Sequence, residues 1–327
     1  MNASLIDVDY YLPDIVRTND QIAAQTQCGD AVSLYRASGV MTRRLAGPDE
    51  APSDMALRAA KRLMTRQAKA SNKIGALIFC SHIGDSRSPV TAALLHGRLE
   101  LPETCLSLDV PGGCAGFTNA LMLAKSIVVA GQAAYVLILT AEAASKTIPE
   151  DDHVLMSIFG DGAAAALVAK TKHSGIGDFC AGTDSAGARS LSVVGGGARE
   201  PLAFLPFGQL RMNGADLLRF ALRRVPVLLN DVLLKNNLTP DDIDLFIFHQ
   251  ASGFILSALK RKCDIADDRF LVCLEDVGNT VSSTIPIAIA RAVENGRIRP
   301  GMRLMLLGFG VGYAWSGSVI TWTGETL

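Results

Sequence analysis

The sequence contains few charged residues and has no excess of either sign. Charged residues make up 19% of the 327 positions, with 31 lysines and arginines against 32 aspartates and glutamates. The net charge of −1 gives no global attraction to nucleic acid or to an anionic membrane. We therefore expect no nucleic-acid partner and no membrane binding, and an acidic partner would have to be recognised by a local basic patch.

Cysteine motifs and long apolar segments are missing as well. The 7 cysteines form no CxxC pair, which argues against a zinc or redox centre, and we expect neither metal nor cofactor. The N-terminal stretch MNASLIDVDYYLPD has no basic region followed by an apolar one, so no secretory signal is predicted. The most apolar tract, 127–144, is interrupted by Gly131 and Gln132, which is unlike a membrane span. These absences favour a cytoplasmic protein.

What the sequence does contain is a large apolar fraction, 49% of the residues, arranged in short runs. Such runs alternate with helical patterns, as is typical of buried strands in an α/β fold. Strands are predicted at 74–80, 133–141, 163–170, 243–249, 302–310 and 316–322, and helices at 53–70, 115–130, 215–236 and 284–295.

The two halves of the chain resemble each other. GCAGFTNALMLAKSIVVAGQ (113–132) aligns without a gap with GNTVSSTIPIAIARAVENGR (278–297). IGALIFC (74–80) aligns with IDLFIFH (243–249) at nearly the same offset. A duplicated α/β unit produces such a pattern.

The duplication predicts where three reactive side chains meet. Packing of the halves about a pseudo-twofold axis would place Cys114 and Asn279 at equivalent helix N-termini, with His249 at the carboxyl end of its strand. The helix dipole is expected to lower the pKa of Cys114, whose small neighbours let an acyl carbonyl approach. A Cys/His/Asn set also fits a cysteine protease, but a thiol among apolar strands favours an acyl chain.

These residues lie in the motifs of a known family. The sequence resembles the thiolase superfamily and, within it, the ketoacyl-ACP synthase III enzymes. The resemblance implies a thiolase-like α/β fold of five layers, αβαβα, made of two duplicated halves with mixed sheets: 1–170 with the nucleophilic cysteine and 171–327 with the histidine and asparagine. It also implies a homodimer. The matching motifs are SGVMTRR (38–44), CAGFTNAL (114–121), IFGDGAAAAL (158–167), HQAS (249–252), GNTVSST (278–284), NGRIRPG (295–301) and LLGFGVGYAWSGS (306–318).

The resemblance implies a mechanism. Cys114 takes an acyl group from a primer thioester, and His249 with Asn279 hydrogen-bonds the carbonyl of malonyl-ACP, stabilising the enolate formed as CO2 leaves. Attack on the acyl-cysteine gives a 3-oxoacyl thioester. Backbone N–H groups of Cys114 and Val311 form the oxyanion hole, with Val311 where the family has glycine, and Phe117 helps to exclude water. The substrates are acyl and malonyl thioesters of ACP or CoA, and no cofactor is implied.

The chain departs from the family where CoA binds. The tryptophan and two arginines that clamp the CoA nucleotide align with Ser33, Ala37 and His153, and Arg36 stands next to one of these positions as a possible replacement. Acyl-CoA therefore stays a possible primer, but its usual binding mode is not expected.

An acidic carrier protein needs basic docking residues. Arg219 and Arg223 lie one turn apart on the helix predicted at 215–236, and Lys260 follows the HQAS motif. Ser252 replaces the asparagine of the family's HQAN, and Phe254 replaces an arginine just after it. We take all five as candidate substrate or carrier contacts.

The leading hypothesis is a decarboxylative Claisen condensing enzyme, and the departures at the CoA positions indicate a specialised fatty-acid or secondary-metabolite pathway. One alternative is an acyltransferase that passes the acyl group to an alcohol or amine. Another is a non-catalytic subunit of a heteromeric condensing complex. Asn279 favours condensation, and the intact trio argues against a non-catalytic subunit. The remaining histidines His82, His96 and His173 are expected in loops or at the surface.

Overall fold

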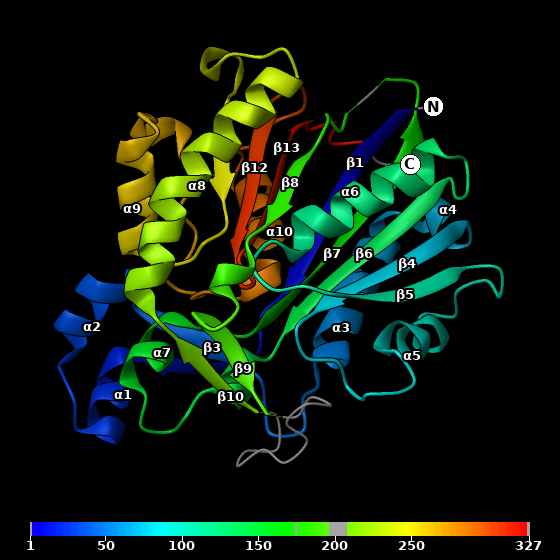
Figure 1. Ribbon diagram of the computed structural model, residues 1–327. Coiled ribbons are helices and arrows are strands. Elements are labelled where there is room, and N and C mark those ends of the chain that lie inside the picture. The colour runs from blue at the N-terminus through cyan, green and yellow to red at the C-terminus, as the bar shows by residue number, and fades with distance from the viewer. Residues whose placement is uncertain (1, 174, 196–207, 326–327) are drawn as a thin grey trace.

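Two mixed β-sheets face each other across a pair of helices in the computed structural model, which describes residues 2–173, 175–195 and 208–325 (Figure 1). The first sheet has the order β1 (Asn2–Tyr11), β7 (Gly162–Thr171), β6 (Tyr135–Glu142), β4 (Ile74–Ser81) and β5 (Leu106–Pro111). The second has the order β11 (Leu245–Phe248), β12 (Arg303–Gly310), β13 (Ala314–Thr321) and β8 (Cys180–Thr183).

Helices cover both sheets on both faces and so produce five layers (Figure 1). The central pair is α6 (Gly116–Val129) and α10 (Thr284–Glu294), whose apolar residues form one core with the inner faces of both sheets. The outer layers are α3 (Pro52–Arg66) with α5 (Thr91–Arg98), and α8 (Gly214–Lys235) with α9 (Gly253–Lys262). The predicted αβαβα architecture is confirmed.

The second sheet repeats the topology of the first. β8, β13, β12 and β11 correspond in order and direction to β1, β7, β6 and β4, with the same antiparallel and parallel pairings. In the second sheet, a parallel bridge between Phe246 and Phe270 occupies the position that the pairing of β4 with β5 has in the first sheet. The helices follow the same order, which confirms the duplication. The division at residue 170 stays a prediction; β7 ends at Thr171.

The remaining elements gather at the end of the sheets where the reactive residues lie (Figure 1). They include two hairpin-like pairs, three short helices and a 3-10 turn that carries residues of the site. These are β2 (Ile15–Thr18) with β3 (Thr42–Leu45), β9 (Leu191–Val194) with β10 (Gln209–Met212), α1 (Asn19–Thr26), α2 (Ala31–Ser38), α7 (His153–Ile158) and η5 (Val281–Ser283). Further short turns are α4 (Ala68–Ser71), η1 (Ala144–Thr147), η2 (Ser185–Gly187), η3 (Pro240–Asp242) and η4 (Asp267–Arg269).

Three of the four predicted helices are found within about one residue at each end, as boundary uncertainty allows. The helix predicted at 53–70 instead ends at Arg66, because the buried Gln67 leaves the helical backbone and its side chain donates to Asp7 at 3.1 Å. In the described part of the chain, no helix combines the length and the apolar composition needed to cross a membrane.

Candidate active site

Cys114 lies in the short connection between β5 and α6, and its residue is 6% exposed. Glycines keep the space around it open. A Cβ added at Gly310 would lie 2.5 Å from the Cys114 Sγ, and one added at Gly308 would lie 2.8 Å from the Cα of Ala115. Since real Cβ atoms do not approach so closely, β12 can pass beside the cysteine only because it carries glycine at these positions.

Two backbone N–H groups point at the thiol. They belong to Val311 and to Cys114 itself, and both act to lower the pKa of the Cys114 thiol. They are the two groups predicted to hold the oxyanion, and an acyl carbonyl on this sulfur would meet them. The turn accommodates valine because Gly113 faces it: a Cβ there would lie 2.5 Å from the Val311 Cγ1.

The prediction of a lowered cysteine pKa is wrong for the ligand-free protein. Burial raises the pKa of Cys114 to about 11, the Val311 N–H opposes this, and the nearby Glu142 carboxylate raises the pKa further. The helix dipole does not compensate, because α6 begins only at Gly116 and the sulfur is shielded from water. Cys114 is therefore a neutral thiol at neutral pH.

Alkylation of Cys114 by iodoacetamide is therefore expected to accelerate with pH up to at least about pH 10. Only the thiolate reacts, and below a pKa of about 11 its fraction rises about tenfold per pH unit. Peptide-level mass spectrometry after timed labelling measures the rate, with N-acetylcysteine as the reference thiol. A plateau of the Cys114 rate at or below pH 8 would contradict the dominance of burial.

His249 follows β11 directly and is 1% exposed. Its Nδ1 lies 2.8 Å from the Thr284 Oγ1, and its ring meets that of Phe309 edge-on with centroids 5.7 Å apart. These contacts fix the ring and leave Nε2 available in the cavity that His249 lines. Burial lowers the pKa of His249 to about 3, so the imidazole is neutral.

Asn279 is oriented by two backbone groups. Its Oδ1 accepts from the Val281 N–H at 2.9 Å, and its Nδ2 donates to the Ala251 carbonyl at 3.1 Å. The amide is thereby fixed with one N–H still available. The turn that presents the Val281 N–H is strained, because this β-branched residue has a φ of 52°. Asn279 caps no helix: η5 begins after Thr280 and α10 after Ser283.

Two cavities meet at Cys114. The first, which we call the inner cavity, has a volume of about 240 Å³ and is lined mainly by apolar residues that include Phe159, Leu191 and Val311. The second, the outer cavity, has a volume of about 310 Å³ and is lined by Cys114, His249 and Asn279 together. The structure thus brings the three predicted side chains together from both halves of the chain. Their catalytic roles stay predictions.

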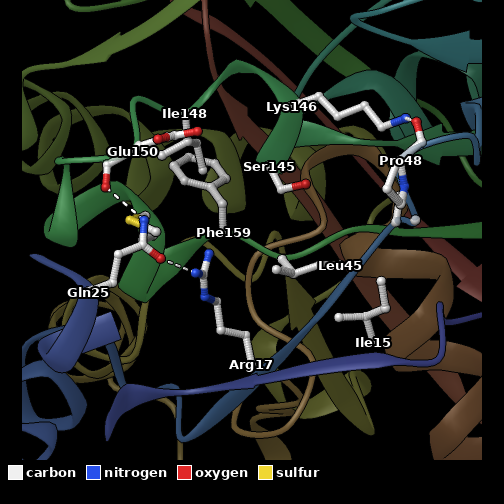
Figure 2. A pocket seen from close by; sticks show the side chains of 13 residues that line it. Ile15, Arg17, Gln25, Leu45, Pro48, Ser145, Lys146, Ile148, Glu150 and Phe159 are labelled. Carbon is white, nitrogen blue, oxygen red and sulfur yellow. Dashed lines mark hydrogen bonds between the residues drawn. The ribbon is translucent and has the colours of Figure 1, made fainter. Parts of the chain in front are cut away.

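A larger cavity of about 730 Å³ lies outside this site, between β2, β3 and the segment before α7 (Figure 2). Arg17 and the carbonyl of Glu150 both contact the Gln25 side chain at its rim. Phe159 lines this cavity as well as the inner and outer ones. Its lining includes no cysteine or histidine, and the Ser145 hydroxyl and Lys146 ammonium that line it are engaged by Asp161 and by the carbonyls of Pro48 and Glu50.

The predicted substrate contacts Phe117 and Ser252 each have a structural role. Phe117 is fully buried in the core between the sheets and lines neither cavity at Cys114, because its side of α6 faces that core. Phe159 lines both cavities instead. Ser252 lines the outer cavity, but its hydroxyl accepts from the Ile255 N–H at 3.3 Å as the N-cap of α9.

The outer cavity reaches the surface beside one of the three residues aligned with the CoA clamp, Ala37. Ala37 and Phe254 line it, and Phe254 is 56% exposed. The Ser33 hydroxyl is bound within the cap of α2, donating to the Asp30 carbonyl at 2.8 Å. His153 lies at the start of α7 rather than in a loop, 3.5 Å from the exposed Cys28. Arg36 is exposed beside Ala37.

The basic candidates differ in their distance from the mouth of the outer cavity. Arg219 follows Leu218, which lines that cavity, and pairs with Asp216 on its own helix. Arg223 lies one turn further along α8. Lys260 pairs with Asp267 near the opposite end of α9, about 9 Å along the helix from Phe254. Arg219 is therefore better placed to meet a carrier than Lys260.

His82 lies in a loop, as expected, but not at the surface. This histidine follows β4, has a side chain only 19% exposed, and lines the inner cavity beside Cys114. The pseudo-symmetry explains the position, since β4 corresponds to β11, which is followed by His249. His96 is partly buried in α5, its Nε2 3.0 Å from the Pro102 carbonyl, whereas His173 is exposed as expected. Within the described ranges, no three His, Cys, Asp or Glu side chains cluster as metal ligands do.

Comparison with known proteins agrees with this geometry. Sequence models of 3-oxoacyl-(acyl-carrier-protein) synthase III match residues 108–185, and those of its C-terminal part match residues 233–322. The chain is 30% identical over 325 residues to the beta-ketoacyl-(acyl-carrier-protein) synthase III of Deinococcus deserti, covering 99% of this chain and 92% of that one.

Solved structures give the same result. A 3-oxoacyl-(acyl-carrier-protein) synthase III superposes with a TM-score of 0.95 at 37% identity, covering 98% of this chain and 100% of the other. The beta-ketoacyl-(acyl-carrier-protein) synthase III of Thermus thermophilus superposes with a TM-score of 0.91 at 34% identity over 98% and 100% of the two chains. The resemblance inferred from the motifs is confirmed.

Proposed function

The chain belongs to the 3-oxoacyl-(acyl-carrier-protein) synthase III family of condensing enzymes, and from this membership we propose that Cys114, His249 and Asn279 join an acyl group to malonyl-ACP with loss of CO2. The observation that carries the assignment of residues is their meeting at one cavity, with two backbone N–H groups at the thiol.

Acylation uses the groups around Cys114. The sulfur attacks the primer carbonyl through its small thiolate fraction, and the N–H groups of Cys114 and Val311 hold the oxyanion. Collapse breaks the bond to the carrier sulfur, which leaves with the thiol proton. The acyl chain then occupies the inner cavity, and the outer cavity is free for the second substrate.

Condensation uses the groups across the outer cavity. When the Thr284 hydroxyl donates to Nδ1, neutral His249 carries its proton on Nε2. This Nε2–H and the remaining N–H of Asn279 donate to the malonyl thioester carbonyl, so the enolate forms as CO2 leaves. Its carbon attacks the acyl-cysteine carbonyl and expels the Cys114 thiolate. That thiolate takes a proton from solvent, so each cycle consumes one proton.

Plain acyl transfer to an alcohol or amine is the second candidate, and it needs a base to deprotonate the acceptor. Neutral His249 could serve as that base, but Asn279 is fixed as a hydrogen-bond donor and has no use in such a step. The oriented amide therefore favours condensation. Release of CO2 from malonyl-ACP by the acylated protein tests the choice: acyl transfer without CO2 would favour the alternative.

The carrier is an acyl carrier protein for both substrates. The clamp that would hold a CoA nucleotide is replaced by an alanine, a capped serine and a histidine at the start of α7. Exposed Phe254 gives the mouth an apolar edge instead. These replacements support a specialised pathway rather than general fatty-acid initiation.

Charge reversal at the mouth is expected to slow reaction with the acidic carrier. Arg219→Glu and Arg36→Glu should each lower the second-order rate of acyl transfer from acyl-ACP about tenfold at low salt, because rim charges steer association. Lys260→Glu, at the far end of α9, should have a smaller effect. Rates with the acyl thioester of N-acetylcysteamine serve as the control, since this donor carries no protein. Equal losses with both donors would contradict a docking role.

Two further features are part of the proposal. β5 pairs only with β4 among the described strands, and its first residue, Leu106, is 54% exposed, so the edge of the first sheet is open to a second copy. We take this edge as the surface of a homodimer. We also propose that the protein acts in the cytoplasm, where its carrier substrates would be found.

A further inference from the structure

The wall of the inner cavity carries an ion-pairing histidine that the proposed mechanism does not use. His82 Nδ1 hydrogen-bonds the Glu142 Oε2, and the His82 backbone N–H donates to the same oxygen at 3.3 Å. Glu142 is 0% exposed at the end of β6. Its other oxygen accepts from the Ser282 hydroxyl at 2.5 Å. Glu142 therefore links His82 in the first half of the chain to Ser282 in the second half, beside Cys114.

A fully buried carboxylate needs a cationic or strongly donating partner. Within the described residues, Glu142 contacts the Ser81 and Ser282 hydroxyls and His82, and no lysine or arginine pairs with it. Burial lowers the pKa of His82, but the attraction and hydrogen bond of Glu142 outweigh it and raise the pKa overall. His82 is thus held as a hydrogen-bond donor.

The ring nitrogen of His82 that does not contact Glu142, Nε2, is the one available to a ligand in the inner cavity. Nδ1 is occupied by Glu142, and Nε2 makes no hydrogen bond to the described residues. The rest of the cavity wall is mainly apolar, with Leu191, Val193 and Leu210 among its lining. With the side chain 19% exposed, Nε2 is open to this cavity and is a polar atom that a bound ligand would meet.

His82 does not serve as the base for Cys114. Among the described residues, His82 makes no hydrogen bond to the Cys114 sulfur, and its Nδ1 is engaged by Glu142. Its place is on the wall that the acyl chain of an acyl-cysteine would face.

We propose that His82 selects an acyl group that carries a hydrogen-bonding oxygen, such as a hydroxyl or oxo group, a few atoms from the thioester carbon. This inference rests on the proposed acylation of Cys114. The cavity volume of about 240 Å³ is below the range of about 300–1,000 Å³ common for small-molecule sites, so the acyl group is short. With Nδ1–H donating to Glu142, a neutral ring offers Nε2 as an acceptor to a hydroxyl, and a protonated ring offers Nε2–H as a donor to either oxygen group. In both forms the Glu142 carboxylate holds the ring in place.

The test compares two acyl donors that differ by one hydroxyl, the butyryl and 3-hydroxybutyryl thioesters of N-acetylcysteamine. Intact mass gives the rate of acyl adduct formation on Cys114. The wild-type protein is expected to react faster with the hydroxylated donor. His82→Leu should lower the ratio of hydroxylated to plain rates about tenfold or more, and His82→Gln, which can still donate, should restore part of it. His173→Leu, an exposed histidine outside both cavities, is the matched control.

The outcomes separate the two proposals. If the wild type forms no adduct with any donor, the acylation of Cys114 itself fails. If adducts form and the ratio is the same in wild type and His82→Leu, acylation stands and the role of His82 is overturned. A His82→Leu protein that loses both rates while His82→Gln keeps the wild-type ratio of the two rates supports the proposal, because the hydrogen-bonding group is then what matters.

Discussion

Cys114→Ala is expected to form no acyl adduct and to lose at least about 10⁴-fold in condensation rate, the scale on which covalent catalysts lose activity without their nucleophile. The alanine leaves the N–H groups of residues 114 and 311 in place but removes the thiol whose pKa they lower. The change is small in volume and the site is lined by glycine, so the fold should persist. Intact mass after incubation with acyl thioesters measures the adduct.

The control for this variant is another cysteine. Cys263→Ala changes a partly exposed thiol at the end of α9, away from both cavities, and should keep full acylation. If Cys114→Ala still carried one acyl group per chain, or if Cys263→Ala lost it, the nucleophile would be wrongly assigned.

His249→Ala and Asn279→Ala are expected to slow condensation by about 10² to 10³-fold each while acylation of Cys114 changes little. Each removes one preorganised donor to the developing enolate, and oxyanion donors contribute on this scale. Neither side chain donates to the Cys114 sulfur. The measurement separates the steps: adduct formation by intact mass, and CO2 release from malonyl-ACP by the preacylated protein.

The variant Asn279→Asp tests specifically whether Asn279 acts as a hydrogen-bond donor. A carboxylate keeps an acceptor for the Val281 N–H but cannot donate, and it would meet the Ala251 carbonyl with like partial charge. Condensation should therefore fall at least as far as in Asn279→Ala. Variants of His249 and Asn279 that slow acylation as much as CO2 release would contradict the division of labour between the two cavities.

The duplication predicted the α/β class and the meeting of the central trio, whereas the five-layered architecture was implied by the resemblance to the family. The match of 113–132 with 278–297 places Cys114 and Asn279 at equivalent junctions, and the end of β11 supplies His249. Local apolar periodicity then located most strands and helices. The helix predicted at 53–70 ended early because the contact of Gln67 with Asp7 is a tertiary one.

What the sequence could not predict depends on burial and on contacts between distant segments. The pKa of Cys114 is governed by exclusion of water, which a motif does not reveal. His82 and Glu142 are 60 residues apart, and the strands that bring them together give no pairwise signal. The one available sign was positional: His82 follows β4, and the corresponding strand β11 is followed by His249. Phe117 was misplaced because the apolar residues of α6 do not show which layer each one faces.

The most direct test of the account is a single turnover. Protein acylated on Cys114 is mixed with malonyl-ACP, and CO2, the acyl-cysteine and the product thioester are followed by rapid quench and mass spectrometry. The account predicts that one CO2 is released for each acyl group lost from Cys114 and that the product on ACP is the 3-oxoacyl thioester two carbons longer. Loss of the acyl group without CO2, or CO2 release with the acyl-cysteine intact, would contradict it.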